Sequence, residues 1–270
     1  QDFYRSRLRL ASFFKEKGHN VYAGVPDDGY IKKIQDKGIN VISLGESIRG
    51  RGLNNVLRFV FVLFKVFQRN EFDVIHCYRM QPNIVGCLIA SATTNSKIFG
   101  TITGLGYIFT VPSIKNTLRS KILLLFYFLI DRFTRTKLIT QNQGDAITLK
   151  LKNNSIIKGS SADESVFKPI KRKRTKRANN SFSILLASRL LNSKGIKTLT
   201  KSIDSINSDN SGIKLNLTIA GEIDKENPDS ISLDELEELK KTKNTYFIGK
   251  SKNMYELITE SDLCVLPTTY

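Results

Sequence analysis

The side chains best suited to chemistry lie in one short segment, 187–196, which reads ASRLLNSKGI. Its two cations, Arg189 and Lys194, follow a predicted strand and precede a predicted helix. In a parallel α/β sheet this position is the carboxyl edge, where ligands bind. A guanidinium, an ammonium and the N–H groups of a helix N-terminus together suit a diphosphate. The alternative is a pair of solvated basic residues.

A second set of candidates lies in the first half of the chain. His76 comes near the end of the predicted strand 73–77, so it either faces a ligand cleft or is a satisfied core histidine. Thr103 and Gly104 follow the predicted strand 97–102. A glycine there either lets a ligand approach the backbone closely or forms an ordinary tight turn.

The sequence does not support a disulfide framework, a zinc site or a nucleophilic catalytic site. The three cysteines, Cys77, Cys87 and Cys264, are far apart and form no CxxC pair. Neither a disulfide framework nor a zinc site is therefore expected, and a reducing compartment fits best. The sequence also contains no Ser-His-Asp spacing, HExxH motif or phosphate-binding P-loop, so nucleophilic and zinc mechanisms are not indicated.

Alternating strands and helices must position these residues. Predicted strands cover 20–24, 40–44, 73–77, 97–102, 138–140, 183–187, 215–220, 246–248 and 263–266. Predicted helices cover the segment from Phe3 to Gly18, 31–36, 53–68, 82–92, 114–133, 196–206, 233–241 and 254–259. Such alternation predicts an α/β fold with parallel sheets. Two such series predict two Rossmann-like domains whose sheets face each other across a ligand-binding cleft.

Charge divides the chain at the same place as the strand pattern. The 270 residues carry 42 basic and 25 acidic side chains, a net charge of +17. Residues 1–167 hold 24 basic and 12 acidic side chains, 168–177 hold seven basic and no acidic ones, and 178–270 hold 11 basic and 13 acidic ones. We predict an N-terminal domain over 1–167, a basic linker over 168–180 and a C-terminal domain over 181–270.

The basic run has other interpretations. It is also typical of a nuclear-localisation or nucleic-acid-binding patch. A basic nucleic-acid-binding or membrane-binding protein without catalysis is therefore an alternative, although no RNP, helix-turn-helix or zinc-finger pattern supports the first of these.

Two stretches, 60–64 and 122–130, are strongly apolar. Nine apolar residues cannot span a bilayer, which needs roughly 20. We favour a buried helix for the longer stretch, with an interfacial helix as the alternative. Attachment to anionic lipid requires basic flanking residues. Those present are Lys115, Arg119, Lys121, Arg132 and Arg135.

Seven segments match the motifs of one known family in the right order. They are FYRSRL (3–8), DVIHCYRMQPNIVG (73–86), TITGLGYIF (101–109), IKGSSADESVFKP (157–169), ASRLLNSKGI (187–196), GEIDKENPDSIS (221–232) and FIGKSKNMYELITESDLCVLPTTY (247–270). Together they resemble glycosyltransferase family 4, the retaining enzymes of the GT-B fold, in its bacterial surface-polysaccharide subgroup. The resemblance covers nearly the whole chain.

This resemblance implies a nucleotide-sugar donor, most often a UDP-sugar, on the C-terminal domain and an acceptor on the N-terminal one. Arg189 and Lys194 match the residues that bind the donor diphosphate and stabilise the leaving phosphate, so no metal cofactor is implied. Gly249 and Lys250 would approach the base, whereas His76, Thr103 and Gly104 would lie on the acceptor side.

The subgroup commonly extends undecaprenyl-diphosphate-linked glycans. The resemblance therefore implies a lipid-linked acceptor, an anionic membrane surface and no nucleic acid as partners. It also implies a peripheral location at the cytoplasmic face of the cell membrane.

The sequence departs from the family pattern in several places. Ser6 and Thr103 stand where many members have histidine. The Gly-rich loop that precedes the first helix, and the two-glutamate motif expected just after Tyr270, are absent. We therefore expect a chain truncated at both ends that is inactive by itself. A GT-B-fold sugar-nucleotide epimerase is the alternative enzyme. It would need catalytic carboxylates and histidines that cannot be assigned to residues of this sequence.

Overall fold

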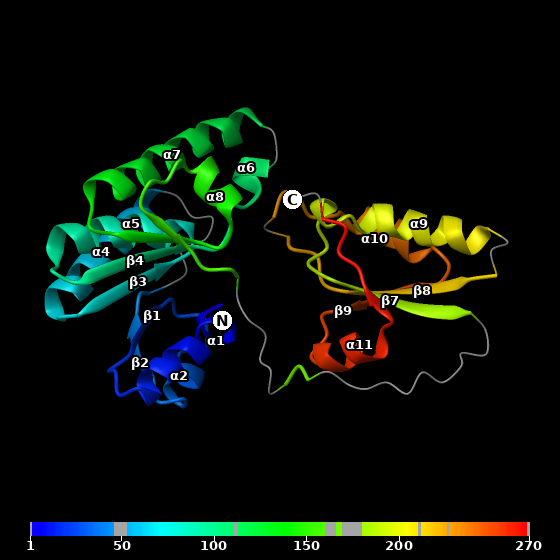
Figure 1. Cartoon of the computed structure of the whole chain (residues 1–270), viewed down its shortest axis with the longest axis horizontal. Helices are drawn as coiled ribbons and strands as arrows, with labels where there is room; N and C mark the ends of the chain where they lie inside the picture. The colour runs from blue at the N-terminus through cyan, green and yellow to red at the C-terminus, as the bar shows by residue number, and fades with distance from the viewer. Residues whose placement is uncertain are drawn as a thin grey trace. The chain divides into compact units, whose positions relative to one another are not determined.

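The computed structural model describes residues 2–45, 53–110, 113–159, 166–168, 180–209, 212–225 and 227–268. The chain divides into two compact units, Gln1–Ser160 and Ser161–Tyr270 (Figure 1). Each unit is built on parallel strands that alternate with helices, which confirms the predicted α/β class. Most of the predicted linker, residues 169–179, lies outside the described residues.

The first unit contains two parallel sheets, one of two strands and one of four. The strands are β1 (Tyr22–Val25), β2 (Asn40–Ser43), β3 (Val74–Tyr78), β4 (Lys97–Ile102), β5 (Lys137–Thr140) and β6 (Asn154–Ile156). The helices are α1 (Asp2–Ser6), α2 (Leu8–Glu16), α3 (Ile31–Gln35), α4 (Leu53–Arg69), α5 (Met80–Thr93), α6 (Tyr107–Thr110), α7 (Ile114–Phe133) and α8 (Gln143–Thr148). Among the described strands, β1 and β2 pair only with each other, and the larger sheet has the order β3-β4-β5-β6.

Helix α5 is the centre of the first unit. It contacts β3, β4, α4 and α7. Its own Cys87 and Ala90 are fully buried, and so is Ile98 of β4. This packing fixes the orientation of β3 and β4, whose other face carries His76.

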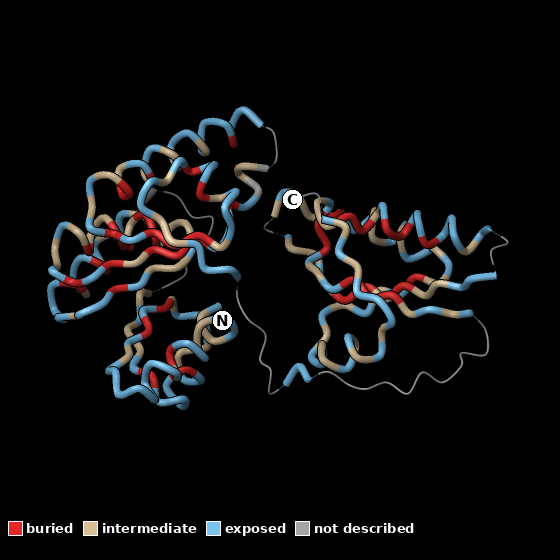
Figure 2. Tube along the Cα trace, in the orientation of Figure 1, coloured by how far each residue is buried: buried red, intermediate tan, exposed pale blue. Residues whose placement is uncertain are grey.

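Helix α7 is buried on one face only. Tyr127, Ile130 and Asp131 point into the unit and are buried. Apolar side chains on the opposite face are exposed, and these are Ile114, Leu118, Ile122, Leu125 and Phe128. Figure 2 shows this alternation along the helix. The prediction of a buried helix is therefore right for the inner face and wrong for the outer face. Within the described residues, no helix has the length and apolarity needed to cross a membrane.

The second unit has one parallel sheet with the strand order β10-β7-β8-β9. Its strands are β7 (Ser181–Ala187), β8 (Lys214–Ala220), β9 (Thr245–Gly249) and β10 (Leu263–Cys264). Its helices are the short 3-10 helix η1 (Asn192–Lys194) and the α-helices α9 (Ile196–Ser208), α10 (Leu233–Lys240) and α11 (Met254–Glu260). Helices α9 and α10 lie on one side of the sheet and α11 lies on the other (Figure 1).

Residues 166–168 belong to this second unit by their contacts. The ring of Phe167 lies 6.0 Å from that of Tyr255 on α11. The Tyr255 hydroxyl also donates a hydrogen bond of 3.5 Å to the carbonyl oxygen of Lys168.

Candidate active site

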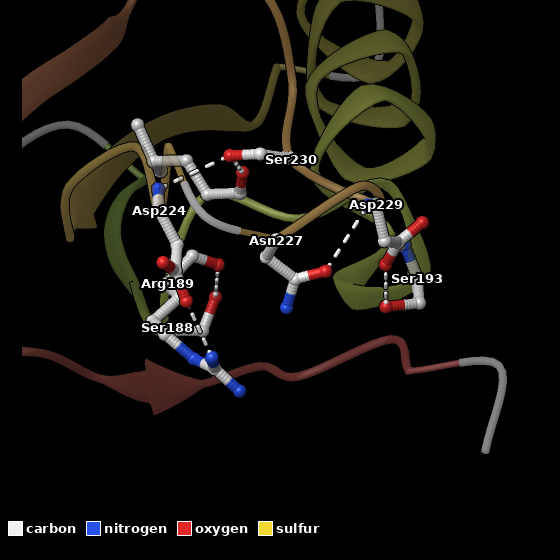
Figure 3. Close-up of polar contacts among 8 residues, drawn as sticks. Ser188, Arg189, Ser193, Asp224, Asn227, Asp229 and Ser230 are labelled. Carbon is white, nitrogen blue, oxygen red and sulfur yellow. Dashed lines mark hydrogen bonds and ion pairs between the residues drawn. The ribbon is translucent and has the colours of Figure 1, made fainter. Parts of the chain in front are cut away.

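The predicted donor residues all lie at one edge of the second sheet. Because β10, β7, β8 and β9 are parallel, their carboxyl ends meet at this edge. The segments that follow them are 188–195 after β7, 221–232 after β8, 250–253 after β9 and 265–268 after β10. Figure 3 shows the first two of these segments side by side.

Backbone hydrogen bonds join the 188–195 segment to the 221–232 segment. The Leu190 N–H donates to the Glu222 carbonyl at 3.0 Å, and the Ile231 N–H donates to the Leu190 carbonyl at 3.0 Å. The Asn192 N–H donates to the Asp229 carbonyl at 2.9 Å. The segment that carries Arg189 and Lys194 is thus held by main-chain hydrogen bonds at Leu190 and Asn192.

Arg189 projects from this edge with an exposed side chain. Its Nη1 lies 2.6 Å from Oδ2 of Asp224, a residue of the 221–232 segment (Figure 3). Asp224 was not predicted from the sequence. It lies four residues after the end of β8, in the loop next to the one that carries Arg189, and an acidic residue just after a neighbouring strand is the signal that could have found it.

Lys194 ends η1 and immediately precedes the N-terminus of α9. Gly195 caps this helix with a left-handed backbone (φ +66°), and no side chain caps it. Ile196, the first residue of α9, is fully buried and anchors the helix. The backbone of Lys194 and the first N–H groups of α9 therefore belong to the same turn.

Two glycines allow the loops at this edge to approach one another. A Cβ on Gly195 would overlap the carbonyl oxygen of Pro267 in the segment after β10, and a Cβ on Gly221 would overlap the carbonyl oxygen of Ser188. Any larger residue at either position must push apart two of the segments that form the edge.

Replacing Gly195 with alanine should lower the free energy of unfolding of the second unit by about 3 kcal/mol or more. A left-handed backbone costs an alanine about 1–2 kcal/mol, and overlap with Pro267 adds a packing cost. Urea unfolding monitored by circular dichroism measures the loss. Gly212→Ala is the matched control, because Gly212 has φ +70° and open space around it. Equal losses in the two variants would show that the Pro267 contact is unimportant.

The other predicted donor residues, Gly249 and Lys250, end β9 and begin the next loop. The Gly249 carbonyl accepts a 2.8 Å hydrogen bond from the Gly221 N–H, which ties the ends of β8 and β9 together. Gly249 has φ +68°, and Lys250 is exposed. Both therefore lie at the same edge as Arg189, two strands away.

His76 lies on β3 in the first unit, where both ring nitrogens are engaged. Its Nε2 is 2.7 Å from Thr101 Oγ1, and its Nδ1 is 2.9 Å from the Tyr78 hydroxyl. The imidazole also stacks on the Tyr78 ring with 4.1 Å between centroids. His76 is thus hydrogen-bonded to Thr101, two residues before Thr103, and its ring is both stacked on and hydrogen-bonded to Tyr78.

Arg7 completes this cluster from the junction of α1 and α2. Its guanidinium lies 4.3 Å above the centre of the Tyr78 ring. Desolvation by the surrounding protein and, to a smaller extent, the Arg7 charge lower the pKa of His76 to about 4, although part of the residue remains exposed. His76 is therefore neutral at pH 7. Because the unfolded chain binds this proton more readily than the folded one, the contribution of His76 to the free energy of unfolding is lost as the pH falls from about 6.5 toward 4.

Thr103 and Gly104 lie in the exposed loop after β4. Gly104 has φ +122°, a conformation that favours glycine, and has open space around it. Arg7 and Tyr78 were not predicted from the sequence as part of this cluster. Tyr78 could have been found because it lies two residues from His76, and so on the same face of β3.

Metal-binding groups are not found in the described parts of either unit: no cluster of three or more His, Cys, Asp or Glu side chains occurs there.

Family models match both units. Residues 2–143 match the model described as Glycosyl transferase 4-like, and residues 167–270 match the model described as Glycosyl transferases group 1. The chain belongs to the glycosyl transferase 4-like family. It is a glycosyltransferase of the GT-B fold, as the sequence resemblance predicted.

A curated relative matches nearly the whole chain. It is the N,N'-diacetylbacillosaminyl-diphospho-undecaprenol alpha-1,3-N-acetylgalactosaminyltransferase of Campylobacter jejuni, 26% identical over 278 residues, with 98% of this chain and 71% of the relative covered.

Solved structures share the fold at lower identity. The sucrose-phosphate synthase of Thermosynechococcus elongatus has a TM-score of 0.71 at 16% identity, covering 97% of this chain and 69% of its own. The Anabaena protein HepE, solved in complex with UDP, has a TM-score of 0.68 at 15% identity, covering 97% and 70%.

Proposed function

We propose that this glycosyltransferase moves a sugar from a UDP-sugar to a lipid-linked acceptor in surface-glycan synthesis, with retention of the anomeric configuration. The observation that carries the proposal is the edge of the second sheet, where Arg189, Lys194 and the N-terminus of α9, which no side chain caps, lie in one short segment. The complex of HepE with UDP and the diphospho-undecaprenol in the name of the Campylobacter relative support the donor and the acceptor class.

The chemistry follows from charge. When the bond between the sugar and the diphosphate breaks, negative charge develops on the leaving phosphate oxygens. A guanidinium can bind two phosphate oxygens through its fork of N–H groups, and an ammonium adds a point charge. The N–H groups of the α9 N-terminus add partial positive charge. Arg189 and Lys194 would thereby stabilise the leaving group without a metal ion, while Gly249 and Lys250 would contact the nucleotide base.

The acceptor side of the proposal rests on the first unit. His76 is neutral and bonded at both ring nitrogens, so its proposed role is to hold Tyr78 and not to carry a proton. Thr103 and Gly104, in the exposed loop after β4, would be available to the acceptor.

We also propose that the enzyme works as a peripheral protein on the anionic cytoplasmic face of the cell membrane, with α7 as the contact. The exposed apolar side chains of α7 follow one another at intervals of three or four residues, which places them on one side of the helix. Lys115, Arg119 and Lys121 are exposed beside them. An apolar face bordered by cations matches an anionic lipid surface.

UDP binding to the full chain tests the donor site. We expect isothermal titration calorimetry to detect UDP binding that is the same with and without EDTA, because cations of the chain take the place of a metal. Transfer by the full-length enzyme to a diphosphate-linked lipid acceptor, with the anomeric configuration of the product read by NMR, tests the reaction itself. Abolition of UDP binding by EDTA would contradict the metal-free mechanism, and an inverted product would contradict retention.

A further inference from the structure

We propose that Asp224 is a positioning residue for the donor: it holds one arm of the Arg189 guanidinium so that the rest of the fork faces the diphosphate. This inference rests on the proposed donor site and adds a residue to it. Asp224 acts through Arg189 and does not touch the donor itself.

The contact between the two side chains uses one arm of the arginine. Nη1 of Arg189 lies 2.6 Å from Oδ2 of Asp224 (Figure 3). Among the described residues, Nε and Nη2 of Arg189 take no partner. A guanidinium has five N–H donors, and two that lie side by side suffice to bind a phosphate. The Asp224 contact therefore leaves a phosphate-binding pair available.

The main chain fixes the position of Asp224. Its N–H donates to Ser230 Oγ at 3.1 Å, and Ser230 Oγ in turn donates to the carbonyl oxygen of Leu190 at 3.2 Å. The carbonyl oxygen of Asp224 accepts a hydrogen bond of 2.8 Å from the Asn227 N–H. Ser230 thus links the backbone of Asp224 to Leu190, the residue that follows Arg189. These hydrogen bonds hold the backbones of Asp224 and Arg189 close together, so that the carboxylate lies within reach of the guanidinium.

Asp224 is expected to strengthen UDP binding although its carboxylate carries the same sign of charge as the diphosphate. Arg189 is 60% exposed, and a solvent-exposed ion pair contributes little to stability. The ion pair instead contributes by ordering the Arg189 side chain in advance, because a side chain that is already ordered loses less conformational freedom when the donor binds. Simple electrostatics predicts that removing a carboxylate near a diphosphate strengthens binding. Positioning predicts that it weakens binding.

The test is the dissociation constant of UDP, measured by titration calorimetry on the full chain. Asp224→Ala should weaken UDP binding by about 3- to 10-fold, the range expected when one long side chain must be newly ordered. Asp224→Asn keeps an oxygen for Nη1 and should bind UDP within about 2-fold of the wild type. Ser230→Ala, which removes the tether without touching Arg189, should weaken binding in the same direction as Asp224→Ala.

Two controls separate positioning from other effects. Glu222→Gln removes a charge from an exposed side chain in the same segment and should leave UDP affinity unchanged. In an Arg189→Ala background, Asp224→Ala should have no further effect, whereas a general loss of loop structure would weaken binding there too. Thermal unfolding of each variant shows that the second unit remains folded.

The outcomes distinguish this inference from the proposed function. If the wild-type chain does not bind UDP, both fall. If the wild type binds UDP and Asp224→Ala binds it equally well or more tightly, the donor site stands and the positioning role is overturned.

Discussion

Replacing Arg189 with alanine in the full-length enzyme should slow sugar transfer by about 10²- to 10³-fold, the effect of removing one donor that stabilises a developing oxyanion. The same substitution should weaken UDP binding by about 10- to 100-fold, because charge-assisted hydrogen bonds to the diphosphate are lost. The loss of rate should exceed the loss of affinity, since charge on the leaving phosphate is greater in the transition state than in the bound donor.

Arg189→Lys separates charge from geometry. Lysine keeps the positive charge but lacks the planar fork, so it should recover part of the UDP affinity and little of the rate. Initial rates of transfer and calorimetric titration of UDP measure the two effects. Lys201→Ala removes an exposed positive charge from α9 and serves as the control, with no change expected. An Arg189→Ala variant with wild-type rate and affinity would remove the basis of the proposed donor site.

The donor-side site was more predictable from sequence than the acceptor-side site. Arg189, Lys194 and Gly195 lie within seven residues between a strand and a helix, so local sequence order already brings them together. Asp224 is 35 residues away from Arg189 along the chain, and its proximity depends on the pairing of β7 with β8. Periodicity predicts that both strands exist, but it does not tell which residue after one strand will meet which residue after the other.

The same limit applies to the cluster around His76. The strand 73–77 was predicted, and so was the possibility that His76, near its end, faces a ligand-binding cleft. The partners that satisfy its ring, Thr101 and Tyr78, and the arginine that lies over Tyr78, come from β4, β3 and the α1–α2 junction. The strand pattern alone left the choice between a ligand-facing and a satisfied histidine open.

Short elements were missed for a different reason. Helices α6 and α8 have four and six residues, and β6 has three. None is long enough to display an apolar period of 3.6 or 2. The long helix α7 was predicted with correct bounds, but its apolar run did not decide between a buried and an interfacial helix, because nine successive apolar residues have no polar face to read.

That exposed side leads to the second large expected effect. The double substitution Leu118→Asp/Leu125→Asp should reduce binding of the full chain to vesicles that contain anionic phosphatidylglycerol by about 30- to 100-fold. Each leucine would lose the free energy of transfer into the acyl boundary, and each aspartate would be repelled by the anionic surface. Sedimentation with sucrose-loaded vesicles measures the bound fraction.

The chain itself provides a matched control for this effect. Leu233, at the start of α10, is 64% exposed against 62% for Leu118, but its neighbours Asp234 and Glu235 are acidic. Leu233→Asp should therefore leave vesicle binding unchanged, because an exposed leucine among carboxylates has no attraction to anionic lipid. Binding of the wild type should also fall when neutral phosphatidylcholine replaces the anionic lipid or when salt is raised, since Lys115, Arg119 and Lys121 act through screened charge. If the double variant binds anionic vesicles as the wild type does, the membrane contact lies elsewhere than on α7.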